Sequence, residues 1–242
     1  MTQNQSRQDS VILVAALHKI SPGKKLPGSR KFLEAWASTQ PISQAPACPE
    51  EVAFALANLA VAVGQSAIGA AMLLTFCGLR IGEAIALVGD KVVFMPDAVI
   101  LFIDVSKRGR DQRVVLTNPV VIAWLHNYSK QAKVKPDQKF CNTSYSKYRF
   151  WLKRLCDMLG VGDLGFSSHS FRRGGASSLL IKGVPISNIV EFGRWANENS
   201  CRDYLRRGEV YQLRLKTQLS PHLWSRINLL ASASNIIWAL PS

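Results

Sequence analysis

The spacing of apolar residues predicts helices along most of the chain. From residue 50 to residue 88, small and apolar side chains recur with the period of an α-helix, and Gly64 and Gly78 interrupt the pattern. A helix is also predicted to begin at His169, after the capping residues Ser167 and Ser168, and to end at Gly183–Pro185. The stretch from residue 50 to residue 88 is thereby divided into helices at 50–63, 66–77 and 79–88. Further helices are predicted at residues 11–19, 30–38, 119–131, 144–159 and 186–192. A last amphipathic helix is predicted to begin at Leu223.

In the middle of the chain, β-branched residues replace the helical period. Short strands are predicted at residues 91–95, 99–105 and 113–116, with Pro96–Asp97 as the turn between the first two and the loop SKRGRDQR joining the last two. Strands joined by such short connections pair antiparallel. The predicted fold class is therefore mainly α with a small antiparallel β-sheet (α+β).

Two adjacent glycines, Gly174 and Gly175, fall inside the helix that begins at His169. Each costs about 1 kcal/mol relative to alanine in a helix interior. Their presence indicates that the backbone approaches another helix or a ligand closely, and tight helix packing is the favoured explanation.

The charge of the chain favours a polyanionic partner. The formal net charge is +14 and the pI is near 9.9, although 48% of the residues are hydrophobic and predict a globular chain. Nucleic acid is favoured over an anionic membrane surface, because the basic residues form no polybasic run beside an amphipathic anchor. No apolar run is long enough to cross a membrane, and Val11–Leu17 lacks the flanks of a signal peptide.

Cysteine and histidine usage predicts an intracellular protein without a bound metal. The five cysteines are odd in number and contain no Cys-x-x-Cys, which is typical of free thiols in a reducing compartment. The four histidines show no metal-ligand spacing, so we expect neither a metal nor another cofactor. The expected location is intracellular and DNA-associated, in a nucleus or a bacterial cytoplasm.

Candidate chemistry begins with His169 and Arg172, which share a face in the first turn of a predicted helix. A helix start with an imidazole and a guanidinium suits an anion, although a surface arginine beside a capping histidine is the plainer alternative. A second arginine, Arg80, lies in an apolar helical pattern and needs a partner because an unpaired buried charge is costly. Glu83 is one available partner and a phosphate group is another.

Together these motifs resemble the catalytic domain of the tyrosine recombinases, the phage-type integrases. The resemblance is carried by GLRIGEAIAL (residues 78–87), a lysine in the strand region, His-x-x-Arg, and a tryptophan nine residues before a tyrosine, and it covers roughly residues 49–210. Many members have a second histidine at the position of Trp195. A tryptophan at this position is the variant that Cre recombinase shows. The resemblance implies that DNA strands are cut and rejoined through a 3′-phosphotyrosyl link, without metal or ATP.

The resemblance also implies a role for each matched residue. Arg80 and Arg172 would bind the non-bridging phosphate oxygens, Glu83 would hold Arg80, and His169 would accept a proton or donate a hydrogen bond to the phosphate. Trp195 would pack at the site and could donate through its indole N–H.

Two of the implied roles have competing candidates. Tyr204 matches the nucleophile by its spacing from Trp195, and Tyr211 is the competitor seven residues later. Lys107 best matches the general acid that protonates the leaving 5′ oxygen, and the neighbouring Arg108 is its alternative. The plainer interpretation of this pair is an exposed hairpin tip that touches only the DNA backbone.

Basic residues outside the motifs are candidates for DNA contact. On helix 144–159, Lys147 and Arg154 share one side, with Arg149 and Lys153 nearby. This region contributes to major-groove contacts by the resemblance, and is otherwise a solvated basic face. The expected DNA-binding residues are Lys147, Arg149, Lys153, Arg154 and Arg173. Arg194 fits no role in the motif, and contact with phosphate is the role suggested for it.

The predicted domain organisation has three parts. Residues 1–48 form an arm or the remnant of a DNA-clamping domain, residues 49–218 form the catalytic domain, and residues 219–242 form an amphipathic helix. That helix either packs on its own domain or is exchanged with a neighbouring protomer of a homo-oligomer on double-stranded DNA. Function classes that compete with a recombinase are a DNA-binding remnant, a type IB topoisomerase-like nicking enzyme and a general basic interaction protein.

Overall fold

The computed structural model describes residues 45–106, 109–195 and 198–238. The chain divides into two compact units, Met1–Gln44 and Ala45–Ser242, and every described residue belongs to the second. The helices expected at residues 11–19 and 30–38, and most of the expected arm at residues 1–48, lie outside the described part.

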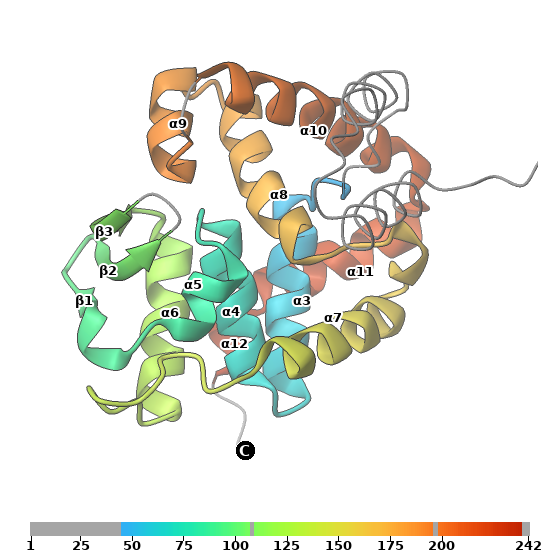
Figure 1. The fold of residues 1–242 in the computed structure, drawn as a ribbon. Helices are drawn as coiled ribbons and strands as arrows, with labels where there is room; N and C mark the ends of the chain where they lie inside the picture. Colours follow the sequence, from blue (N-terminus) through green and yellow to red (C-terminus); the bar gives the residue numbers. More distant parts are fainter. Residues whose placement is uncertain (1–44, 107–108, 196–197, 239–242) are drawn as a thin grey trace, which may run out of the picture. The chain divides into compact units, whose positions relative to one another are not determined.

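The second unit is mainly helical with one small sheet (Figure 1). The bounds of α3, α4, α6, α7, α8 and α9 follow the predicted ranges closely, whereas no range was predicted for α10 or α12. The helices are α3 (Glu50–Ala62), α4 (Ser66–Phe76), α5 (Ile81–Ala86), α6 (Pro119–Gln131), α7 (Tyr145–Leu159), α8 (Ser168–Ile181), α9 (Ile186–Gly193), α10 (Glu198–Gln218), α11 (Pro221–Ser232) and α12 (Ser234–Ile237), with two 3-10 turns, η1 (Gly89–Lys91) and η2 (Gly162–Leu164).

The three predicted strands form the predicted antiparallel sheet, in the order β1-β2-β3. The strands are β1 (Val92–Phe94), β2 (Val99–Ser106) and β3 (Gly109–Leu116). In the described chain β3 begins at Gly109, four residues before the predicted start, because polar residues such as Gln112 still pair with β2, here with Ile103. The sheet therefore reaches further toward the loop that holds Lys107, which itself lies outside the described residues.

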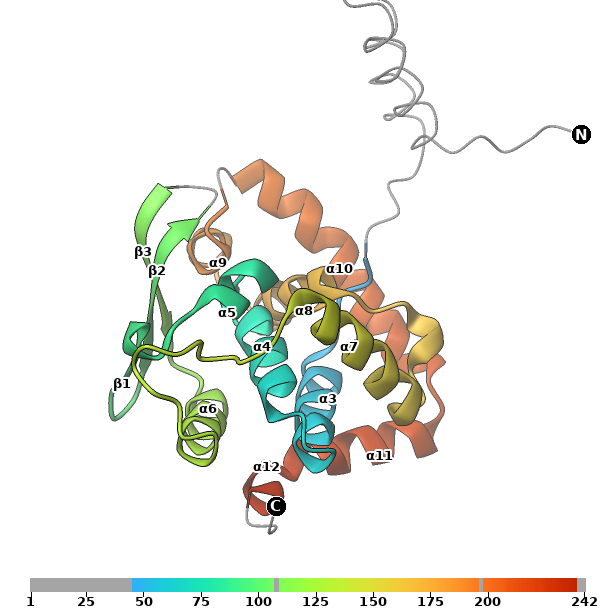
Figure 2. The same ribbon diagram turned by 60° about the horizontal axis from the view of Figure 1, so that its bottom comes forward.

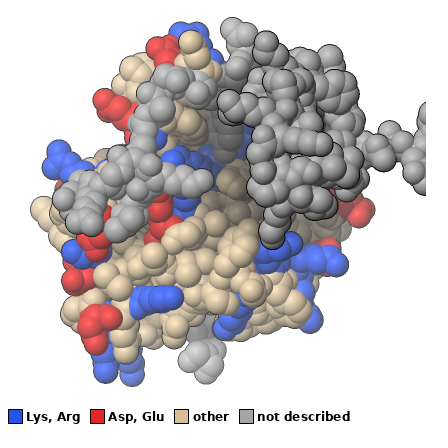
Figure 3. All heavy atoms as spheres, in the orientation of Figure 1, with Lys and Arg blue, Asp and Glu red and all other residues tan. Residues whose placement is uncertain are grey.

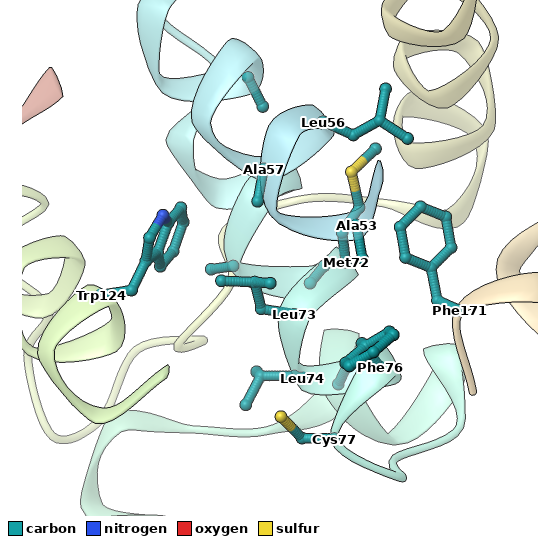
Figure 4. Close-up of a cluster of buried hydrophobic side chains, with 14 of the residues drawn as sticks. Ala53, Leu56, Ala57, Met72, Leu73, Leu74, Phe76, Cys77, Trp124 and Phe171 are labelled. Carbon is teal, nitrogen blue, oxygen red and sulfur yellow. The ribbon is translucent and has the colours of Figure 1, made fainter. Parts of the chain in front are cut away.

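Helices α3 and α4 form the centre of the unit. Both are apolar on all sides rather than amphipathic, which is the pattern of a helix that other elements surround. Figure 2 shows α3 and α4 side by side, with α7, α8 and α11 around them. In Figure 4 the side chains of Met72 and Leu73 on α4 lie between Trp124 of α6 and Phe171 of α8. All four side chains are fully buried.

The C-terminal helices pack on α3 of the same chain. The Asn58 side chain donates to the carbonyl oxygens of Leu230 (2.7 Å) and Ala231 (3.2 Å), and the Trp124 indole donates to Asn58 Oδ1 (2.8 Å). Trp238 meets Trp124 edge to face, with ring centroids 5.0 Å apart. In this single chain the C-terminal helices thus pack on their own domain. Their exchange with a neighbouring protomer stays a prediction.

The prediction that a helix spans residues 79–88 was wrong at its start. Helix α5 begins at Ile81, with Arg80 as an extended N-cap and Gly78 at a φ of +96°. The reason lies in a side chain. The Glu83 carboxylate accepts a hydrogen bond from the Arg80 backbone N–H at 2.7 Å, which caps the first turn and makes Arg80 the residue before the helix.

Among the described helices, none combines the length and the apolar character needed to cross a bilayer.

Candidate active site

One pocket collects residues from three separate parts of the chain. Its volume is about 240 Å³, and its walls come from the α4–α5 region, the first turn of α8 and the turn after α9. The lining residues are Thr75, Arg80, Ile81, Ser168, His169, Arg172 and Trp195. Four of the six residues expected to be catalytic therefore line one small pocket.

Arg80 is held in this pocket by a salt bridge within its own turn. Its Nη1 lies 2.7 Å from Glu83 Oε1, while its backbone N–H donates to Glu83 Oε2. The Arg80 side chain keeps 31% of its surface exposed, whereas Glu83 keeps 6%. Burial by itself raises the pKa of Glu83. Hydrogen bonds from Arg194 and Arg80 outweigh burial and hold that pKa below its ordinary value of 4.5. The carboxylate is therefore charged at neutral pH.

Arg172 is anchored to two backbone carbonyls. Its guanidinium donates to the carbonyl oxygen of Gly78 at 2.5 Å and to that of Gly193. The same group lies 5.2 Å from the centroid of the Trp195 ring, a cation–π distance. Arg172 is 7% exposed, so a ligand in the pocket would meet an already positioned guanidinium. His169, one turn earlier on the same helix, is exposed.

Close helix packing brings these elements together, as the two glycines predicted. A Cβ added to Gly174 would lie 1.9 Å from the carbonyl oxygen of Cys48, and one added to Gly175 would lie 1.8 Å from that of Phe76. Helix α8 therefore touches the backbone of the segment before α3 and of the end of α4. This approach puts the first turn of α8 within reach of the turn that carries Arg80.

The two tyrosine candidates both belong to α10. The side chain of Tyr204 lies outside the described part of the structure. Tyr211 is partly buried, and burial raises its pKa above the ordinary value of 10.0. Lys107 and Arg108 also lie outside the described residues.

Exposed basic residues follow α7, as expected. Lys147, Arg149, Lys153 and Arg154 are all exposed, and Figure 3 shows Lys and Arg side chains gathered over this helix. A groove of about 830 Å³ runs from here to His169 at the start of α8. Its aromatic residues interleave with the arginines. Arg149 lies 6.0 Å from the Tyr145 ring, and Arg154 lies 5.6 Å from the ring of Phe150.

Arg173 is not part of this basic surface. Its side chain is 4% exposed, and its guanidinium donates to the carbonyl oxygen of Ala45 at 2.9 Å. Arg173 was expected to contact DNA. In the structure its side chain is instead directed at the segment that leads into α3. The sequence indicated that Arg173 and Arg172 point in different directions, but not which direction leads inward.

Arg194 was missed as part of the site. Its guanidinium lies 2.5 Å from Glu83 Oε2 and 3.2 Å from Gln112 Oε1, and its side chain is 8% exposed. No sequence pattern indicates these contacts, and the left-handed conformation of Arg194, which favours glycine or asparagine, is seen only in the structure.

Comparison with known proteins agrees with this architecture. The profile described as "Phage integrase family" matches residues 55–209. A structure of the XerH site-specific recombinase bound to palindromic difH substrate, a post-cleavage complex, matches at 18% identity and a TM-score of 0.55, covering 73% of this chain and 54% of that chain. A pre-cleavage complex of XerH with difH matches at 16% identity and a TM-score of 0.55, covering 83% and 67% respectively.

A structure of the XerA recombinase matches at 16% identity and a TM-score of 0.51, covering 91% of this chain and 86% of that chain. At these identities the likeness concerns the fold, which is the mainly α fold with a small antiparallel sheet. The chain spans about half the length of the first XerH structure. No curated protein matches the sequence.

Proposed function

Because the chain belongs to the phage integrase family, we propose that it cuts and rejoins double-stranded DNA through a covalent 3′-phosphotyrosyl intermediate. The proposed reaction uses neither a metal nor ATP. The proposed outcome is site-specific recombination or integration by a homo-oligomer assembled on DNA.

The shared pocket is the observation that carries this proposal. Arg80 precedes α5 and Arg172 belongs to α8, far away in the sequence, yet both line a space of about 240 Å³ with His169 and Trp195. Each guanidinium is held by neighbouring groups, Arg80 by Glu83 and Arg172 by backbone carbonyls. Preorganised positive groups suit phosphoryl transfer, in which catalysis is mostly positioning and electrostatic stabilisation.

In the proposed reaction the scissile phosphate occupies this pocket. Guanidinium groups stay charged at any working pH and donate forked hydrogen bonds to the non-bridging oxygens. They thereby stabilise the negative charge that builds up as a fifth oxygen approaches phosphorus. His169 is exposed at the edge of the pocket, where it can accept a proton or donate a hydrogen bond.

Tyr204 is the proposed nucleophile. Its phenol oxygen forms a bond to phosphorus as the bond to the 5′ oxygen breaks, and Lys107 donates the proton that the leaving oxygen takes up. The phenolic proton goes to His169 or to water. A free 5′-hydroxyl reverses each of these changes and releases the tyrosine. Trp195, in place of a histidine, is proposed to pack beside the phosphate and donate through its indole nitrogen.

The groove along α7 is the proposed DNA surface. Its arginines and lysines would neutralise backbone phosphates and lead the duplex toward His169. Residues 1–48 are proposed to contact DNA as an arm or as the remnant of a clamping domain.

Covalent trapping tests the proposal directly. The full chain is incubated with DNA nicked beside a candidate site, or with fragmented genomic DNA where no site is known, in the presence of EDTA. The sample is denatured, and a protein–DNA adduct is sought on a gel. We expect an adduct with the wild type and with Tyr211→Phe, and none with Tyr204→Phe.

Arginine variants extend the test to the pocket. Arg80→Met and Arg172→Met should each reduce adduct formation by two orders of magnitude or more, in the range found for loss of one oxyanion-stabilising group. The matched control is Arg226→Met, which removes an exposed arginine on α11, away from the pocket. An adduct that persists in Tyr204→Phe but not in Tyr211→Phe would move the nucleophile. No adduct from any variant with DNA binding intact would favour a DNA-binding remnant.

A further inference from the structure

Arg194 occupies an unusual backbone position. It is the C-cap of α9 and adopts the left-handed conformation, with φ at +51° and ψ at +46°. A residue with a Cβ is disfavoured here relative to glycine, which ends many helices in this way. An arginine at such a position indicates that its side chain supplies something that glycine would not.

The side chain is directed inward. The Arg194 guanidinium contacts Glu83 Oε2 (2.5 Å), the Gly78 carbonyl oxygen (3.3 Å) and Gln112 Oε1 (3.2 Å). It is 8% exposed and is absent from the lining of the phosphate pocket. Arg194 therefore does not reach a ligand there, in contrast to the phosphate contact considered from the sequence.

Glu83 receives an arginine on each side. Its Oε1 accepts from Arg80 Nη1, while its Oε2 accepts from both the Arg80 backbone N–H and Arg194. The exposed guanidinium of Arg80 faces the pocket, and the buried guanidinium of Arg194 lies behind the carboxylate. The orientation of Arg80 thus depends on a carboxylate that Arg194 helps to hold in place.

This contact also joins two segments of the proposed machinery. Arg194 lies between α9 and α10 and is followed directly by Trp195, while Glu83 belongs to α5 beside Arg80. The Gly78 carbonyl accepts from Arg172 as well as from Arg194. A Cβ on Gly78 would lie 2.7 Å from the carbonyl oxygen of Phe192, so α9 also packs closely on this turn.

We propose that Arg194 is a positioning residue: it acts through Glu83 to orient Arg80 and fastens the α9–α10 turn to the α4–α5 turn. It rests on the proposed function for its catalytic consequence, but not for the contact itself. Within the described part of the chain, the charged groups that contact Glu83 are Arg80, from its own turn, and Arg194, from the turn that packs against it.

The first test measures DNA cleavage in a single turnover on nicked DNA. Arg194→Gly removes the side chain and supplies the residue that the left-handed position favours, so this variant should fold. We expect cleavage to slow by about 10²-fold, the scale of a small misplacement of a catalytic group, with DNA affinity nearly unchanged. Arg194→Lys should recover part of the rate, because it keeps the charge but not the planar fork.

A double-mutant comparison identifies the route of the effect. In a Glu83→Gln background, Arg194→Gly should slow cleavage by less than about 3-fold further, because the two residues act as one unit. Lys182→Met is the matched control, since it breaks an ion pair with Glu50 outside the pocket and should leave the rate unchanged. Full multiplication of the two effects would overturn the proposal, as would wild-type cleavage by Arg194→Gly.

The second test does not depend on catalysis. The Glu83 carboxyl is followed by NMR in protein labelled with ¹³C-carboxyl glutamate, and its resonance is assigned with Glu83→Gln. The pH midpoint of the Glu83 titration should be higher in Arg194→Gly than in the wild type, and should rise by less in Arg194→Lys. If the wild type forms no adduct while this midpoint moves, the recombinase function fails and the positioning contact stands. An unchanged midpoint overturns the positioning contact whatever the cleavage assay shows.

Discussion

Gly175→Ala tests the packing on which the pocket depends. The new Cβ would lie 1.8 Å from the carbonyl oxygen of Phe76 and 2.9 Å from its carbonyl carbon. Ordinary contact begins at 3.4 Å, so α8 and the end of α4 would have to separate by more than an ångström. Both partners are backbone, and neither can rotate away as a flexible side chain would.

The magnitude follows from two opposing effects. Alanine favours the helix over glycine by about 1 kcal/mol. Forcing extra volume into a packed interior costs about 1–3 kcal/mol, and the upper end applies where helix backbones collide. We expect a net loss of about 2 kcal/mol in the free energy of unfolding, which corresponds to about 4–8 °C in Tm for a domain of this size.

Urea and thermal unfolding of the full chain measure this loss, with Gly82→Ala as the control. Gly82→Ala is the same substitution on α5, where the added Cβ would meet nothing within 4 Å. This control should therefore be as stable as the wild type or slightly more stable. The DNA cleavage rate of Gly175→Ala should fall by more than the loss of folded protein explains, because moving α8 carries Arg172 away from Gly78. A Gly175→Ala protein within 0.5 kcal/mol of the wild type would refute the close approach.

Three further outcomes are expected. Asn58→Ala should lower the free energy of unfolding by about 3 kcal/mol in urea, because it leaves the buried Trp124 N–H unpaired; a loss below 1 kcal/mol would contradict this. All five cysteines are buried, and burial raises the pKa of Cys77 to about 12, so a thiol reagent at pH 8 should label them only after denaturation, and rapid labelling of the native chain would count against it. Because the folded pKa of Glu83 is depressed, its charge stabilises the fold above the ordinary value of 4.5 and loses this effect as pH falls through the lower folded value. The stability difference between the wild type and Glu83→Gln should therefore shrink below about pH 4.5, and a constant difference from pH 7 to pH 3 would exclude the effect.

The sequence predicted the elements of the fold because their ends are written locally. Gly64 and Gly78, with φ of +71° and +96°, end helices at positions that other residues rarely adopt. The two misplaced starts depend on partners outside the local pattern. Helix α5 begins late because the Glu83 side chain bonds to the Arg80 backbone, and β3 begins early because β2 pairs with polar residues of the expected loop.

The candidate site was predictable where a motif joined residue type to spacing. Arg80, His169, Arg172 and Trp195 came from such motifs, and they line one pocket. Spacing on a single helix could not tell which side of α8 faces the interior, so Arg173 was assigned to the DNA surface although it is buried.

Arg194 could not be predicted for a different physical reason. Its partners, Glu83 and Gln112, are distant in the sequence and become neighbours only when α9 packs on the α4–α5 turn. A local sequence pattern does not encode that packing. The left-handed conformation of Arg194, which indicates a role for its side chain, is seen only in the structure.

The arginines of this site converge on one turn. The carbonyl oxygen of Gly78 accepts from Arg172 and from Arg194, and the next arginine, Arg80, follows two residues later. Helix α8 reaches this turn because Gly175 lets it approach Phe76, and α9 reaches it because Gly78 leaves room for Phe192. The pocket is thus formed by docking of α8 and α9 on a turn that is itself held by Glu83. A substitution that loosens either docking contact should therefore disturb the pocket before it unfolds the chain, since most of the large apolar core is built on α3 and α4 and their other neighbours.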